Sequence, residues 1–181
     1  MKSFGITLVV CIILYIAFYA YFGGFIKIKP EVLEKGGDVL VYEELRGDYK
    51  QTADATNRIY KDLLNNYGIE TFRGIGVYYD DPKAIPVEDL RFEAGCILEN
   101  PTLDQLEILK LKYKVRTLEK GEYVVVNFPF KGFISILMGI KRVYPAINKY
   151  MQENNFKNTG AIVEIYDVPN KIITYMDLVE R

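Results

Sequence analysis

The chain has 181 residues, of which 50% are hydrophobic, with a formal net charge of -1, 15 tyrosines and no histidine. This length accommodates one globular domain and a short additional segment. Without a net positive charge or a basic patch, the chain has no general attraction to phosphate groups, so we expect no nucleic-acid partner. The absence of histidine excludes histidine-ligated zinc and catalysis by Ser-His-Asp or Cys-His groups. No glycine-rich phosphate loop or cluster of metal ligands is present, and we expect neither a cofactor nor a metal.

An apolar, uncharged run covers residues 6–26 and is flanked by Lys2 on one side and by Lys27 and Lys29 on the other. About 20 apolar residues cross a bilayer, so we predict a transmembrane anchor over residues 1–26, in which the apolar run contacts lipid. A cleaved signal peptide and a buried helix of a soluble domain are the alternatives. Because more lysines follow the run than precede it, the positive-inside rule predicts a single-pass membrane protein whose globular domain is cytoplasmic.

The remaining sequence predicts a linker over residues 27–36 and one domain over residues 37–181. Within the domain, hydrophobic periodicity distinguishes strands from helices. The predicted elements in chain order are a strand at 39–42, a helix at 56–67, strands around residue 77 and at 90–98, a short helix at 103–109, an extended segment at 113–118, a strand at 123–128, a helix at 132–151, and strands at 162–168 and 171–176.

The two halves of this domain share the order strand, helix, strand, strand. Residues 74–82 and 162–169 each contain an apolar run, a Tyr-Asp pair and a following proline. Aligning Tyr79 with Tyr166 places Val77 at the position of Glu164. Such a duplication favours an α+β fold, in which a pseudo-two-fold antiparallel sheet with two main helices follows the N-terminal transmembrane helix. A groove between the paired units is a natural ligand site.

Glu164 interrupts the apolar pattern of its strand. Because residues i and i+2 of a strand share a face, Glu164 lies beside Tyr166. A carboxylate on a buried face either holds a proton or keeps its charge by pairing with a lysine or a ligand cation. The ring of Tyr166 adds an aromatic face that attracts cations. The alternative interpretation is that Glu164 faces solvent or makes a structural hydrogen bond.

Several segments resemble the GyrI-like small-molecule-binding family, also called the bacterial effector-binding domain, over residues 37–181. The resemblance is carried by residues 77–82, 91–95, 121–125 and 164–166, and residues 94–98 and 142–146 are similar to a membrane-anchored animal member. It implies two strand-helix-strand-strand modules (SHS2 modules) with a pocket between them. In multidrug-sensing relatives, a buried glutamate and several tyrosines hold cationic aromatic ligands, and by motif position this glutamate corresponds to Glu164. Other members of the family are hydrolases.

We therefore expect a membrane-tethered protein that binds a small aromatic or cationic ligand and is not an enzyme. The candidate ligand-binding residues are Glu164, Tyr166, Tyr42, Tyr49, Tyr60, Tyr144 and Tyr175. One alternative is a hydrolase of electrophilic small molecules, in which Glu164 is the catalytic general base that activates water. Another is a membrane-anchored scaffold that recruits an unknown protein partner and whose groove is filled by its own side chains.

Overall fold

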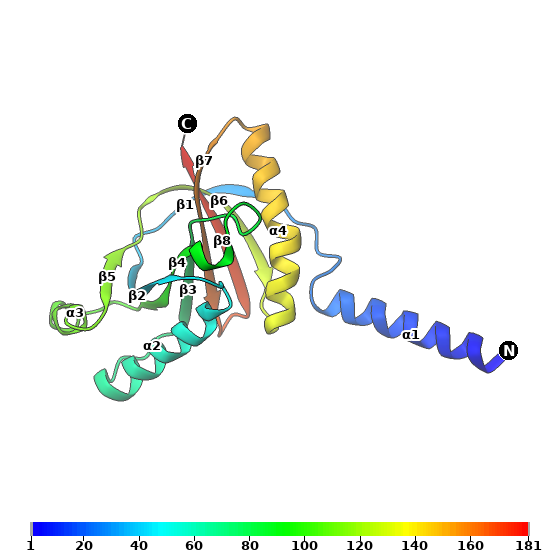
Figure 1. Ribbon diagram of the computed structural model, residues 1–181, viewed down its shortest axis with the longest axis horizontal. Helices are drawn as coiled ribbons and strands as arrows, with labels where there is room; N and C mark the ends of the chain where they lie inside the picture. Colours follow the sequence, from blue (N-terminus) through cyan, green and yellow to red (C-terminus); the bar gives the residue numbers. More distant parts are fainter. Residues whose placement is uncertain (1, 181) are drawn as a thin grey trace.

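The computed structural model describes residues 2–180, with only the backbone described for residues 2–4 and 158–160 (Figure 1). Helices and strands alternate along the described chain. In order they are α1 (Lys2–Tyr21), β1 (Glu31–Lys35), β2 (Val39–Arg46), α2 (Gln51–Tyr67), β3 (Arg73–Tyr78), the 3-10 helix η1 (Val87–Asp89), β4 (Arg91–Leu98), α3 (Leu103–Lys110), β5 (Lys114–Thr117), β6 (Gly121–Pro129), α4 (Phe133–Glu153), β7 (Lys157–Asp167) and β8 (Ile172–Glu180).

The eight strands form one antiparallel sheet in the order β1-β6-β8-β7-β3-β4-β2-β5. Two units of the type strand, helix, strand, strand occur in this order, namely β2-α2-β3-β4 and β6-α4-β7-β8. Their strands β3 and β7 pair with each other in the middle of the sheet, where Gly76 lies opposite Glu164. The remaining strands, β1 and β5, extend the sheet at its two edges. The protein is therefore α+β, with its two units joined along one central strand pair.

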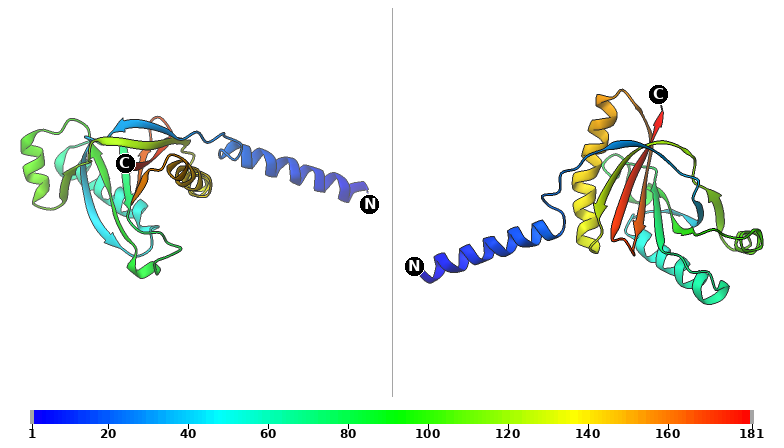
Figure 2. Two further views of the ribbon diagram at one scale, coloured as in Figure 1. Left: turned by 90° about the horizontal axis from the view of Figure 1, so that it is seen from above. Right: turned by 180° about the vertical axis from the view of Figure 1, so that it is seen from behind.

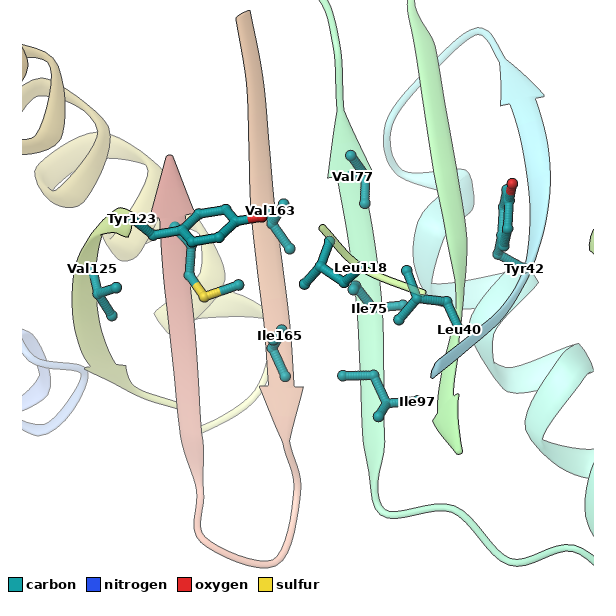
Figure 3. Close-up of a cluster of buried hydrophobic side chains, with 11 residues drawn as sticks. Leu40, Tyr42, Ile75, Val77, Ile97, Leu118, Tyr123, Val125, Val163 and Ile165 are labelled. Carbon is teal, nitrogen blue, oxygen red and sulfur yellow. The ribbon is translucent and has the colours of Figure 1, made fainter. Parts of the chain in front are cut away.

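One face of the sheet curls around a core of buried side chains (Figure 3). Leu40 of β2 and Val125 of β6 belong to the same cluster, although four strands lie between β2 and β6 in the sheet order. Ile75 of β3 and Val163 of β7 lie in the centre of this cluster. Curling of the sheet is what brings such distant strands together, and none of the cluster's members comes from a helix.

The helices α2 and α4 pack against the opposite, outer face of the sheet. Buried positions of α2 recur every three or four residues, and Ile59 and Leu63 pack onto β2 and β4. The helix ends at Gly68, which has a φ of 63° that glycine adopts without strain. In α4, Val143 and Ile147 pack onto β6 and β8 in the same way. Each helix thus covers the outer face of its own unit.

The N-terminal helix differs from the predicted transmembrane anchor. Helix α1 ends at Tyr21, and the following turn contains Gly23 at a φ of 87°. The helical part of the apolar run, residues 6–21, therefore rises only about 24 Å, whereas the hydrocarbon core of a bilayer is about 30 Å thick. Among the residues that the structure describes, no helix combines the length and the apolar character needed to cross a membrane. The predicted transmembrane helix and the predicted single-pass, cytoplasm-facing location are therefore wrong.

The connection between α1 and the sheet also differs from the expected linker. Residues 31–35 form β1, which pairs with β6. Helix α1 points away from the rest of the molecule (Figure 2), but its C-terminal end is fixed. Lys131 Nζ donates to the Tyr21 carbonyl at 2.9 Å, and Arg142 donates to the carbonyls of Gly23 and, at 2.6 Å, Ile26. Basic side chains at this position complement the exposed carbonyls of a helix C-terminus.

Candidate functional site

Glu164 lies in the middle of β7, on the face of the sheet that carries α2 and α4. Its cross-strand neighbours are Gly76 on β3 and Tyr175 on β8. Only 1% of Glu164 is exposed. The strand pair β3–β7 joins the two units, so this carboxylate lies at the junction between them.

Tyrosine hydroxyls hold both oxygens of this carboxylate. Tyr144 on α4 donates to Oε1, and Tyr166 on β7 donates to Oε2. Tyr78 on β3 extends the network, because its hydroxyl lies 3.3 Å from that of Tyr166 and donates to Thr52 Oγ1 on α2 at 3.2 Å. The polar network therefore runs from α4 across β7 and β3 to α2.

Glu164 has no cationic partner within the described part of the chain, since none of the ion pairs there includes it. Burial raises the pKa of Glu164, and the hydrogen bonds from Tyr144 and Tyr166 oppose that rise. Burial, and then the charge of Glu164, raise the pKa of both tyrosines well above its ordinary value, so the two hydroxyls remain donors. A buried carboxylate in such surroundings is costly unless a cation joins it.

Aromatic rings surround the carboxylate. The Tyr175 ring meets the Tyr144 ring edge-on at 5.8 Å, and Phe130 lies 5.8 Å from Tyr166. Tyr144 and Tyr166 are both half-buried as whole residues, and burial is the main cause of the raised pKa of their hydroxyls. The arrangement places aromatic rings around one buried carboxylate.

The structure brings together four of the seven residues predicted from the sequence, namely Glu164, Tyr166, Tyr144 and Tyr175. Tyr49 lies one ring farther away and meets Tyr78 edge-on at 4.8 Å. Tyr42 is part of the core on the curled face, and Tyr60 of α2 packs beside β2 and β4. Neither of these last two residues lies in the hydrogen-bond network around Glu164.

Sequence reasoning missed Tyr78. The alignment of the two repeats placed Val77 at the position of Glu164, but Val77 lies in the core on the curled face and Gly76 is opposite Glu164. The alignment on the Tyr-Asp pairs and the following prolines sets β3 and β7 one residue out of step, so that a residue on the curled face of β3 corresponds to one on the outer face of β7. The cause is that the turns after β3 and β7 differ in length. The available signal was the spacing of Gly74, Gly76 and Tyr78, which share one face of a strand.

The surface has a cleft of about 620 Å³, but this cleft is lined mainly by residues of α2 and does not include Glu164. Two of its charged pairs are already formed, with Arg58 Nη2 2.5 Å from Glu43 and Lys112 Nζ 2.7 Å from Asp62. No group of three or more cysteine, aspartate or glutamate side chains in residues 2–180 is arranged to hold a metal ion. The buried Glu164 carboxylate at the junction, with its tyrosine partners, is therefore the candidate site.

The family model described as a GyrI-like small molecule binding domain matches residues 30–177. The chain belongs to this family. The resemblance identified from the sequence is thereby confirmed, and membership supports small-molecule binding as the general function. The GyrI-like domain is also 34% identical over 87 residues to the testis-expressed protein 264 homolog of Mus musculus. That match covers 45% of this chain and 28% of the mouse protein, so it spans less than a third of the mouse protein's length.

Two solved structures show the fold of the GyrI-like domain. The EcmrR C-terminal domain has a TM-score of 0.60 and 12% identity, and the match covers 85% of this chain and 98% of that one. SAV2435 bound to tetraphenylphosphonium has a TM-score of 0.56 and 14% identity, with 84% and 94% of the two chains covered. At such identities the likeness shows a shared fold alone.

Proposed function

We propose that this GyrI-like domain binds a small aromatic cation beside Glu164, within the network that joins α2 to α4. The observation that carries the proposal is a carboxylate that is 1% exposed and has no cationic partner among the described residues. Both of its oxygens accept hydrogen bonds from neutral tyrosine hydroxyls, so its negative charge is not compensated. A bound cation supplies the missing charge.

The tyrosines give the site a preference for organic cations over small inorganic ones. A cation over the face of a tyrosine ring gains about 0.5–2 kcal/mol, depending on how completely it is desolvated. Tyr144 and Tyr166 also fix the orientation of the carboxylate through their hydroxyls. The ligand class is therefore an aromatic or alkylated ammonium or phosphonium ion. SAV2435 was solved with such a cation, tetraphenylphosphonium, which makes this compound a suitable probe.

Calorimetric titration of the full chain with tetraphenylphosphonium tests the proposal. We expect saturable binding that weakens about 30-fold in Glu164→Gln, which corresponds to about 2 kcal/mol. Glu93→Gln is the matched control, because Glu93 is also buried but already has Arg116 as its partner. The control should keep its affinity within about threefold. Absence of saturable binding to tetraphenylphosphonium, ethidium and berberine contradicts the proposal.

The two alternatives have less support at this site. A general base needs contact with the water that it activates, whereas both oxygens of Glu164 accept tyrosine hydroxyls and the side chain is almost fully buried. The scaffold alternative expects a groove filled by the chain's own side chains. The ring of Tyr78 does lie close to this site, and the same titration separates a scaffold from a binding protein.

A further inference from the structure

Tyr78 lies beside Glu164 because a glycine leaves room for its ring. Gly76 is the residue directly opposite Glu164 on the neighbouring strand. A Cβ atom at Gly76 would lie 2.6 Å from the hydroxyl oxygen of Tyr78 and 2.9 Å from its Cε2 atom. The Tyr78 ring therefore folds back along β3 and covers Gly76. The aromatic volume next to the carboxylate is thus occupied by the chain itself.

This volume is the size of one ring. The next position on the same face of β3 is Gly74, where a Cβ atom would lie 2.9 Å from Thr56 Cγ2 on α2. We call this volume over Gly76, which the Tyr78 ring occupies, the slot. Helix α2 therefore closes the slot on that side. Toward β7, the slot ends at the Glu164 and Tyr166 side chains, which are hydrogen-bonded to each other. The Tyr78 ring is what occupies the space between these boundaries.

The hydroxyl of Tyr78 is held weakly, whereas its ring packs edge-on against Tyr49 at 4.8 Å and lies over Phe92 at 6.3 Å. Its hydroxyl makes two contacts, at 3.3 Å to the Tyr166 hydroxyl and at 3.2 Å to Thr52 Oγ1, and both are long for hydrogen bonds between hydroxyls. Tyr78 is also the last residue of β3, so its rotation does not require a strand to move. Burial and the charge of Glu164 raise the pKa of Tyr78, which keeps the hydroxyl neutral.

We propose that Tyr78 is a removable plug of the ligand site, and that the ligand is a cation with one planar ring, which replaces the Tyr78 ring over Gly76 and places its charge against Glu164. This inference rests on the proposed function. In the free protein the plugged conformation competes with the ligand. The apparent affinity is then lower than the intrinsic affinity by the fraction of molecules in which the slot is open.

Benzyltrimethylammonium, a cation with one ring, tests the plug by calorimetric titration of the full chain. We expect Tyr78→Ala to bind it about tenfold more tightly than the wild type, because the slot is open before binding. Tyr78→Phe keeps the ring but loses both hydroxyl contacts, and its affinity should rise about threefold. The methyl group in Gly76→Ala displaces the Tyr78 ring but also occupies the floor of the slot. Because the ligand ring needs the same floor, binding should weaken at least fivefold.

Gly74→Ala is the matched control for Gly76→Ala, because both variants add one methyl group to the same face of β3. The control should bind within about twofold of the wild type, since its methyl group meets Thr56 and not the slot. Weaker binding by both Tyr78 variants, or equal losses in the two glycine variants, overturns the plug. If Glu164→Gln weakens binding about 30-fold in that case, the proposed function stands. If the wild type does not bind any aromatic cation, the proposed function itself fails.

Discussion

Two buried glutamates on inner strands of the sheet have opposite surroundings. Glu93 on β4 is 7% exposed and lies opposite Val77, on the curled face. Arg116 donates two hydrogen bonds to its Oε2 atom, at 2.7 and 3.1 Å, and Tyr79 donates to Oε1 at 2.6 Å. Glu164 on β7 lies on the outer face, and the groups that donate hydrogen bonds to it within residues 2–180 are tyrosine hydroxyls.

The comparison shows which groups compensate the charge of a buried carboxylate in this protein. At Glu93, these groups are a hydroxyl from Tyr79, a guanidinium from Arg116, and the ring of Tyr42, whose centre is 5.5 Å from the guanidinium carbon. At Glu164, the hydroxyls and rings are present and the cation is missing. Arg116 thus supplies to Glu93 the positive charge that we propose an external aromatic cation supplies to Glu164.

The largest effect should come from removing the cation at Glu93. We expect Arg116→Gln to lower the free energy of unfolding by about 3 kcal/mol, because a buried carboxylate then loses its partner. Urea denaturation measures this change. Arg46→Gln is the control, since the pair of Arg46 and Asp89 is exposed and its atoms are 3.5 Å apart; its loss should stay below about 0.5 kcal/mol. Equal losses in the two variants contradict the comparison.

Asp177 on β8 extends the comparison to a buried carboxylate whose two oxygens have no hydrogen-bond partner among the described residues. Burial raises its pKa from 3.8 to about 6. Between these values the unfolded chain releases the proton and the native protein keeps it, so stability falls as pH rises and stays lower above pH 6. We expect Asp177→Asn to be more stable than the wild type by about 2 kcal/mol at pH 8, with little difference at pH 4.

Urea midpoints at several pH values test this expectation. The gain in Asp177→Asn should develop between pH 4 and pH 6, in step with the titration of the native carboxyl. A loss of stability that is the same at every pH would show that Asp177 acts through packing and not through its charge.

Glu164→Gln should change stability with a sign opposite to that of Glu93→Gln. Because burial raises the pKa of Glu164 above 4.5, ionising this carboxyl group costs more free energy in the native protein than in the unfolded chain. Replacing Glu164 by an uncharged isostere should therefore increase the free energy of unfolding by about 1 kcal/mol at pH 8, and the gain should vanish below about pH 4. Glu93→Gln leaves Arg116 with a neutral partner and should lose about 1 kcal/mol. Two changes of the same sign at pH 8 contradict this account.

The smallest effects should come from single hydroxyls. Tyr144→Phe removes one of two donors to Glu164, and Tyr79→Phe removes a donor from a carboxylate that still has Arg116. We expect losses of about 1 kcal/mol for Tyr144→Phe and about 0.5 kcal/mol for Tyr79→Phe. Thermal unfolding of the two variants side by side gives the order, and the reverse order would mean that the hydroxyls matter more where a cation is present.

Local patterns predicted the elements of this fold. The strand predicted at 39–42 and the helix predicted at 56–67 lie within β2 and α2, because branched residues favour strands and α2 has buried positions at helical spacing before Gly68. The choice of Glu164 as the central residue of the candidate site was also available locally, since a charged residue interrupts an apolar strand.

The missing parts depend on contacts between distant residues. Residues 31–35 carry no strong strand pattern and become β1 by pairing with β6. The face on which Val77 lies is fixed by the register of β3 against β7, and a shift of one residue reverses it. The partner of Glu93 is Arg116, on a strand that is not adjacent to β4 in the sheet. No spacing pattern in the sequence predicts that Glu93 pairs with Arg116.

A carbon-13 NMR titration of the Glu164 carboxyl group, assigned with Glu164→Gln, tests the central claim most directly. In the free protein the pKa of Glu164 should lie above 4.5, because burial without a cation disfavours the charged form. Saturation with tetraphenylphosphonium should lower that pKa, since a cation beside the carboxylate favours its charged form. A pKa that stays the same when the protein is saturated with the cation would contradict the account.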